Sequence, residues 1–161
     1  MNDFKCLCLH YFHERKCILM NKNAELLNFI YQNSQMGVET IDKLIKITEG
    51  ERFKLVLAAQ LEGYSKINDE AKEMLNKNGY DEKGIGAFEK MRTYLMINFQ
   101  TLNDKSSSHI AEMLIIGSNM GVIDAIRNIN KYKNAENDIV NLMEKLKSFE
   151  EDNIEKLKMF L

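Results

Sequence analysis

A five-residue pattern that occurs twice constrains the fold of this chain more than any other sequence feature. The pattern is Ser-x-Met-Gly-Val, at residues 34–38 and 118–122, and its two glycines lie 84 residues apart (121 − 37). Apolar residues on either side follow helical spacing, which places each glycine inside a helix. A glycine inside a helix costs about 1 kcal/mol relative to alanine, so we expect both where backbones must approach closely. The repeat therefore predicts a duplicated helical hairpin.

The composition also favours an all-α protein with a single domain. The chain has 161 residues, no proline and only 8 glycines, so the residues that usually break helices are rare. Strand-like alternation of apolar and polar residues does not occur. A chain of this length can bury a stable core without disulfides or a metal ion.

The charge pattern and the hydropathy pattern argue against several classes of partner. Basic and acidic residues are interspersed and the formal net charge is −2, so no basic face is expected for nucleic acid. No apolar run approaches the roughly 20 residues that span a bilayer, and no signal peptide is recognisable. We therefore expect no membrane or nucleic-acid partner, and a location in the bacterial cytoplasm with free thiols.

The first twenty residues differ from the rest of the chain. They contain all three cysteines and two of the three histidines, in the order Cys-x-Cys-x-His-x-x-His-x-x-x-Cys. This pattern lacks the separated ligand pairs of structural zinc sites, so we do not expect zinc there. Residues 14–16 can be encoded by a purine-rich stretch that resembles a ribosome-binding site, and Met20 follows at a suitable distance. Our hypothesis is that Met20 is the natural start, that residues 1–20 are a tail or are not part of the native product, and that residues 21–161 form a single bundle.

An alternative for this segment is a loosely attached amphipathic helix. The apolar residues that would form its face are Phe4, Leu7, Tyr11 and Leu19. In either case, the remaining chain is the part expected to fold as one domain.

Apolar periodicity predicts four long helices and one short one in that domain. The long helices are expected over residues 22–47, 51–78, 110–132 and from a cap at Asn134 to the chain end. A shorter helix carrying Phe88, Met91, Leu95, Phe99 and Leu102 is expected to join the two hairpins. This connectivity is that of a ferritin-like antiparallel four-helix bundle, made of two duplicated hairpins joined by a short crossover helix.

The glycines suggest how the two hairpins pack. Gly117, Gly121 and Ala125 recur every four residues and form a ridge of small side chains. We expect the helix over 22–47 to cross the helix over 110–132 at Gly37 and Gly121. Replacing Gly121 with leucine would then destabilise the protein by overpacking.

Several segments of the chain resemble a family of short uncharacterised proteins of low-GC bacteria that we associate with the ferritin-like superfamily. These segments are Ser-His-Ile-Ala-Glu-Met at 108–113, Gly-Ser-Asn-Met-Gly at 117–121, Phe149-Glu150 and Leu157-Lys158. The resemblance covers about residues 22–161. It implies a helical bundle that either binds two metal ions or has lost them.

A di-iron or di-manganese site needs a Glu from each of two helices and a Glu-x-x-His from each of the other two. No Glu-x-x-His occurs in residues 22–161, and His109 is the only histidine there. The symmetry also fails, because Asn28 occupies the position that duplicates Glu112. Glu62, His109, Glu112 and Glu150 remain as candidate ligands for a weaker iron or manganese site.

Other polar residues near the inner faces have simpler roles. Ser106, Ser107 and Ser108 precede a helix, which is typical of capping, and adjacent serine and histidine rarely form a catalytic triad. Gln60, Asn119, Asp124 and Asn153 are expected to form a buried polar network.

We therefore expect a non-catalytic bundle without a resident cofactor. It would act through protein contacts, most simply as a homo-oligomer, since apolar residues such as Leu55, Ile97 and Ile116 lie on outer faces. The alternative function is a degenerate carboxylate-metal protein connected with metal handling or oxidative stress.

Overall fold

The structure is a computed structural model that describes residues 3–82 and 104–161, with side chains from residue 22 onward. Its helices are α1 (Asp3–Ile47), α2 (Glu51–Lys77), α4 (Ser107–Lys131) and α5 (Asn137–Leu157), followed by a 3₁₀ turn over Lys158–Phe160. The described residues contain no strand. The predicted all-α class is confirmed, whereas the expected crossover helix over residues 88–102 lies outside the described residues.

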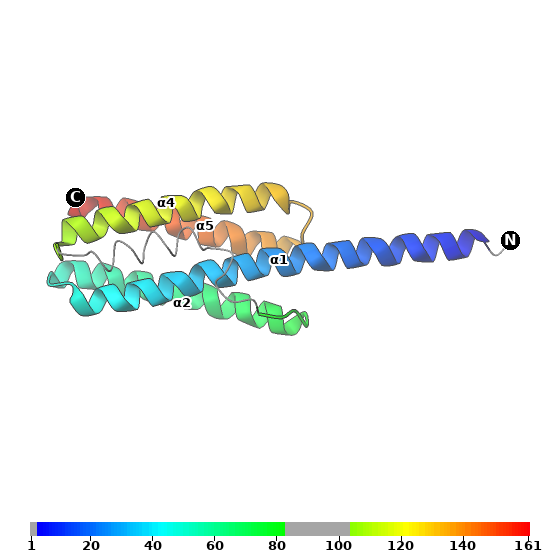
Figure 1. The fold of residues 1–161 in the computed structure, drawn as a ribbon, viewed down its shortest axis with the longest axis horizontal. Coiled ribbons are helices and arrows are strands. Elements are labelled where there is room, and N and C mark those ends of the chain that lie inside the picture. The colour runs from blue at the N-terminus through cyan, green and yellow to red at the C-terminus, as the bar shows by residue number, and fades with distance from the viewer. Residues whose placement is uncertain (1–2, 83–103) are drawn as a thin grey trace.

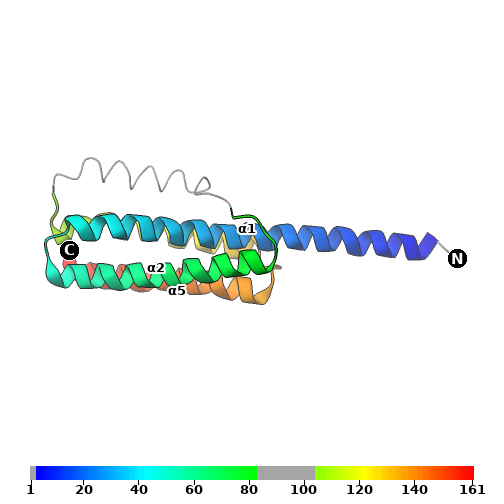
Figure 2. The same cartoon turned by 90° about the horizontal axis from the view of Figure 1, so that it is seen from below.

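The four helices form two antiparallel hairpins that pack side by side (Figures 1 and 2). One hairpin is α1 with α2, and the other is α4 with α5. α2 and α4 run in the same direction, so the end of α2 and the start of α4 lie at opposite ends of the bundle. α5 contacts both helices of the first hairpin, so it makes most of the contact between the two pairs.

Several helix ends lie where the sequence places them. α1 ends at Ile47 and α2 begins at Glu51, after the predicted break at Gly50. Gly79, with φ of +68°, follows the end of α2 in the left-handed conformation that glycine adopts readily. α4 begins after Ser106, whose hydroxyl accepts a hydrogen bond from the backbone N–H of His109 at 3.3 Å. The predicted serine capping is confirmed.

The predicted cap of the last helix at Asn134 is wrong. A turn in which the Ala135 N–H donates to the Tyr132 carbonyl at 2.7 Å delays the helix, and Glu136 is its N-cap residue. The side chain of Asn23 in α1 makes two hydrogen bonds with Glu136. It donates to Glu136 Oε1 at 2.8 Å and accepts from the Glu136 N–H at 3.0 Å.

α1 begins nineteen residues earlier than the predicted helix over 22–47 (22 − 3). The backbone of residues 3–21 continues α1 as an unbroken helix, which projects past the end of the other helices (Figure 1). The helical conformation agrees with the alternative interpretation of this segment.

The apolar residues that recur at helical spacing in the four long helices form one continuous core within the described residues. The largest fully buried side chains are Phe53, Leu26, Leu27, Ile30, Ile41, Leu44, Leu57, Leu75, Ile110, Ile139, Met143 and Leu146. Burial of these side chains provides the main driving force for folding.

α4 is the most apolar of the long helices. By length and composition alone it could cross a membrane, and within the described residues it is the one helix of this kind. Inside the bundle, 44% of its most apolar window is buried. A core helix of a helical bundle has the same composition, so this property is weak evidence for a membrane span.

Candidate functional site

A cluster of buried polar side chains lies at the centre of the bundle. It contains Asn33 of α1, Gln60 and Tyr64 of α2, Ser118 of α4, and Glu150 and Asn153 of α5. These residues lie on the inner faces of their helices at helical spacing from core residues. The same burial of apolar faces that folds the chain therefore brings them together.

The two repeated glycines make room for side chains of the cluster. A Cβ atom at Gly37 would lie 2.5 Å from Cδ1 of Tyr64, so the ring packs directly on the α1 backbone. A Cβ atom at Gly121 would lie 3.2 Å from Oε1 of Glu150 and 3.4 Å from Nδ2 of Asn33. Each glycine thus accommodates a side chain from the other helix of its own hairpin.

This arrangement corrects the expected crossing of α1 and α4 at Gly37 and Gly121. The Gly37 backbone faces the Tyr64 ring of α2, and α4 contacts α1 much less than it contacts α5. The ridge residue Gly117 lines a cavity beside the cluster. The expected crossing does not form because a large side chain fills the space that each glycine leaves.

Tyr64 and Glu150 occupy duplicated positions in the two hairpins. They lie 86 residues apart (150 − 64), two more than the glycines, because the α4–α5 connection spans 132–136 and the α1–α2 connection only 48–50. Their neighbours also meet. The Phe149 ring lies edge-on to the Tyr64 ring with centroids 4.9 Å apart, and it passes close to the backbone of Gly63.

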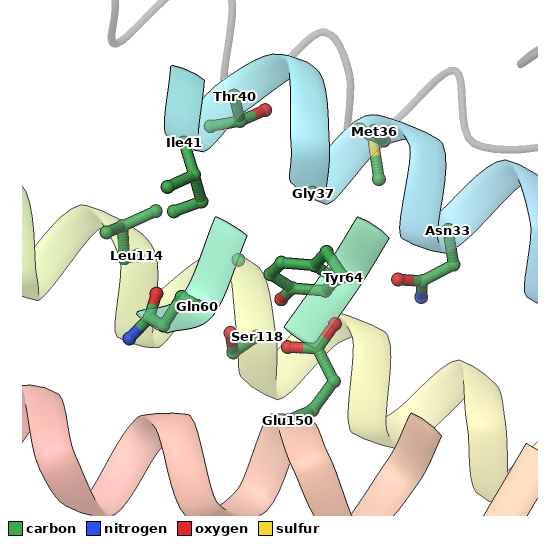
Figure 3. Close-up of a pocket in the computed structure, with 11 residues that line it drawn as sticks. Asn33, Met36, Gly37, Thr40, Ile41, Gln60, Tyr64, Leu114, Ser118 and Glu150 are labelled. Carbon is green, nitrogen blue, oxygen red and sulfur yellow. The ribbon is translucent and has the colours of Figure 1, made fainter. Parts of the chain in front are cut away.

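Burial changes the acidity of both groups. It raises the pKa of the Glu150 carboxyl from 4.5 to about 7, although hydrogen bonding to the Ser118 and Tyr64 hydroxyls stabilises the charged form. Burial, together with the nearby Glu150 charge, raises the pKa of Tyr64 well above its ordinary 10.0. In Figure 3 the two hydroxyls and the carboxyl point toward one another. At neutral pH the carboxyl can therefore gain or lose a proton, whereas the phenol stays protonated.

A cavity of about 30 Å³ adjoins this group (Figure 3). Its lining includes Asn33, Gln60, Tyr64, Ser118 and Glu150, from all four helices. Four buried polar atoms of the cluster have no hydrogen-bond partner among the described residues: Asn33 Nδ2, Gln60 Nε2, Glu150 Oε2 and Asn153 Nδ2. The cavity is small, and its lining combines these polar groups with apolar side chains of both hairpins.

The structure does not bring the four candidate metal ligands together. Glu62 is exposed and pairs with Lys66 at 2.6 Å. His109 lies 4.0 Å from Glu112 near the start of α4, and Glu150 is buried at the bundle centre. Among the described residues, no three His, Cys, Asp or Glu side chains are placed to hold a metal ion.

The predicted polar network is confirmed in part. Gln60 and Asn153 are buried at the bundle centre. Asn119 is exposed and donates to the Ile115 carbonyl of its own helix. Asp124 is paired with the exposed Arg127 at 3.1 Å. Sequence reasoning missed Tyr64 and Ser118 as members of the network, although both lie on inner stripes at helical spacing.

Comparisons with known proteins identify no relative: no protein-family model, no curated protein and no solved structure matches this chain. Among the described residues that line the cavity there is one carboxyl group and no histidine, lysine or cysteine. Its chemistry is that of hydrogen bonding and proton binding.

Proposed function

We propose that the protein is a non-catalytic, ferritin-like helical bundle that acts by self-association through the outer face of α4. The observation that carries this proposal is a row of exposed isoleucines. Ile116, Ile123 and Ile126 are 42%, 49% and 44% exposed, and their spacing of seven and three residues puts them on one side of the helix. A row of large aliphatic side chains on one helix face is typical of an interaction surface.

The ferritin-like part of the proposal is supported by the direction of the helices. α2 and α4 run in the same direction, so the end of α2 and the start of α4 lie at opposite ends of the bundle (Figure 1). An up-down-up-down bundle would need only short connections, whereas ferritin-like bundles have one long crossover.

The charges beside the isoleucines favour a second copy of the chain as the partner. In an antiparallel α4–α4 pair, a two-fold axis that places Ile116 opposite Ile123 of the other copy also places Glu112 opposite Arg127. Both pairs have residue numbers with the same sum (239), so a single axis satisfies both. The side chains of Glu112 and Arg127 are exposed. The surface is therefore self-complementary, as a two-fold interface requires.

The size of the surface sets the expected strength of association. A helix of 25 residues is about 37 Å long. With a width of about 10 Å, its outer face covers roughly half of the 800 Å² per partner that a stable interface buries. We therefore expect a reversible dimer whose population rises with concentration.

Sedimentation velocity over a range of concentrations tests this proposal. Ile123→Asp should abolish the dimer, because it places a carboxylate in the apolar centre of the interface. Leu55→Asp is the matched control, since Leu55 is an exposed aliphatic residue of α2 on another face. A monomer at all concentrations, or equal effects of both substitutions, would contradict the proposal.

A charge swap tests the antiparallel register. Glu112→Arg and Arg127→Glu should each weaken the dimer by placing like charges opposite each other. The double variant should restore it, because the opposite charges then face each other again. A dimer that is sensitive to Ile123→Asp but indifferent to the charge changes would retain self-association and reject this register.

A further inference from the structure

Buried polar side chains line the central cavity and form a hydrogen-bonding site. Glu150 is 3% exposed, and its Oε2 atom lacks a partner among the described residues. Asn33 and Gln60 line the same cavity, and their amide nitrogens also lack partners. A buried polar group without a partner is costly, so native proteins pair such groups with protein atoms or with ordered water.

The size of the cavity limits what can bind in it. A water molecule needs a cavity of roughly 10–15 Å³ and two to four polar partners. The volume of about 30 Å³ fits one or two water molecules. The lining includes apolar side chains such as Met36 and Leu114, but the polar groups of Asn33 and Glu150 distinguish this cavity from a wholly apolar void, which would remain dry.

The hydrogen-bonding character of the unpaired atoms favours water over a metal ion as the occupant of the cavity. Two of those at the cavity, Asn33 Nδ2 and Gln60 Nε2, are hydrogen-bond donors, and the third, Glu150 Oε2, is an acceptor when ionised. A cation cannot accept a hydrogen bond, whereas water can accept two and donate two. We propose that the cavity is a water site, in which a water molecule accepts a hydrogen bond from Asn33 and donates one to Glu150, two groups that both lie beside Gly121.

The same water gives Glu150 a partner in both of its protonation states. Water donates to the ionised carboxylate and accepts from the protonated acid. The other described groups that line this cavity or lie against Glu150 are neutral at physiological pH: Asn33 and Gly37 from α1, Gln60 and Tyr64 from α2, and Gly117, Ser118 and Gly121 from α4. Proton exchange at Glu150 therefore takes place without an opposite charge among these groups.

A high-resolution crystal structure of the full chain tests the water site directly. Crystals would be grown in buffer with EDTA and, separately, in buffer with Mn²⁺. We expect density for one or two water molecules within hydrogen-bond distance of Glu150 and of Asn33, identical in both crystals. A cavity without density, or an anomalous manganese signal beside Glu150, would overturn the proposal.

Water-to-protein cross-relaxation in NMR provides a second test with variants. Glu150→Met keeps the approximate size of the side chain and removes the carboxyl, so the signal between bound water and the Asn33 amide should weaken several-fold. Gln35→Met is the control for introducing a methionine, because Gln35 bonds Glu39 on the exposed side of α1. The wild-type signal is informative even when Glu150→Met does not fold, because its absence would contradict a bound water.

Discussion

The two copies of the Ser-x-Met-Gly-Val pattern have the same backbone role but face different chemistry. In the first hairpin, Gly37 lies against the ring of Tyr64. In the second, Gly121 lies against the carboxyl of Glu150. The missing Cβ therefore leaves space in both hairpins, and a side chain of the partner helix fills that space. Tyr64 and Glu150 also interact with each other. The duplicated positions of the two hairpins are therefore in contact, but one carries a phenol and the other a carboxyl group.

The serines of the two patterns differ in the same way. The Ser34 hydroxyl donates to the Ile30 carbonyl at 2.8 Å and accepts from Asn68 at 3.1 Å, so its bonds stay within the first hairpin. The Ser118 hydroxyl interacts with Glu150 and Tyr64, and so links the two hairpins. The first copy is structural, whereas the second belongs to the polar cluster.

The largest expected effect is a dependence of stability on pH that comes from Glu150. Its pKa rises from 4.5 to about 7 on folding, so the folded state binds this proton more tightly than the unfolded state. This contribution is fully present below pH 4.5 and is lost as the pH rises through 7, a change of about 3 kcal/mol in the free energy of unfolding. Urea denaturation at a series of pH values measures it. Glu150→Gln should remove this contribution, whereas the exposed neighbour variant Glu151→Gln should retain it.

Gly37→Ala is expected to destabilise the protein by about 2 kcal/mol. The new methyl group would lie 2.5 Å from the Tyr64 ring, and the strain outweighs the higher helix propensity of alanine. Thermal or urea unfolding measures the loss. In a Tyr64→Leu background the same substitution should cost less, because the flat ring is gone. An equal cost in both backgrounds would show that the ring is not the cause.

Gly121→Ala is expected to change stability by less than about 1 kcal/mol. Its methyl group would lie 3.2 Å from a carboxylate oxygen at the end of a flexible side chain, and the gain in helix propensity offsets this contact. Gly121→Leu should be clearly destabilising, because the longer side chain reaches into the polar cluster. If Gly121→Ala were as harmful as Gly37→Ala, the two glycines would not differ as described.

The smallest effect separates the two serines. Ser118→Ala removes a hydroxyl that stabilises the Glu150 carboxylate, so the pKa of Glu150 should rise further. Ser34→Ala should leave that pKa unchanged, because its hydroxyl bonds within the first hairpin. NMR titration of the Glu150 side-chain carboxyl carbon measures both. Equal pKa shifts in the two variants would show that Ser118 has no special link to the carboxyl.

Helical periodicity predicted the inner faces because it depends only on local spacing. The same periodicity also explains why the candidate metal ligand Glu112 lies away from the bundle centre. Glu112 lies between the buried residues Ala111 and Met113 but points to the opposite side of α4, where it is exposed. The burial of Glu150 follows equally from its place on the inner stripe of α5. Its surroundings could not be predicted, because periodicity gives the side of a helix and not the residues across from it.

The sequence by itself determined the helical class, the faces that become the core and the outer position of Ile116 on α4, since each follows from composition and local spacing. The tertiary structure alone decided that each glycine receives a side chain, and that Tyr64 meets Glu150 beside a polar cavity. The physical reason is axial register. Two helices can slide past each other without changing their apolar faces, so only packing of all four helices fixes which residues meet.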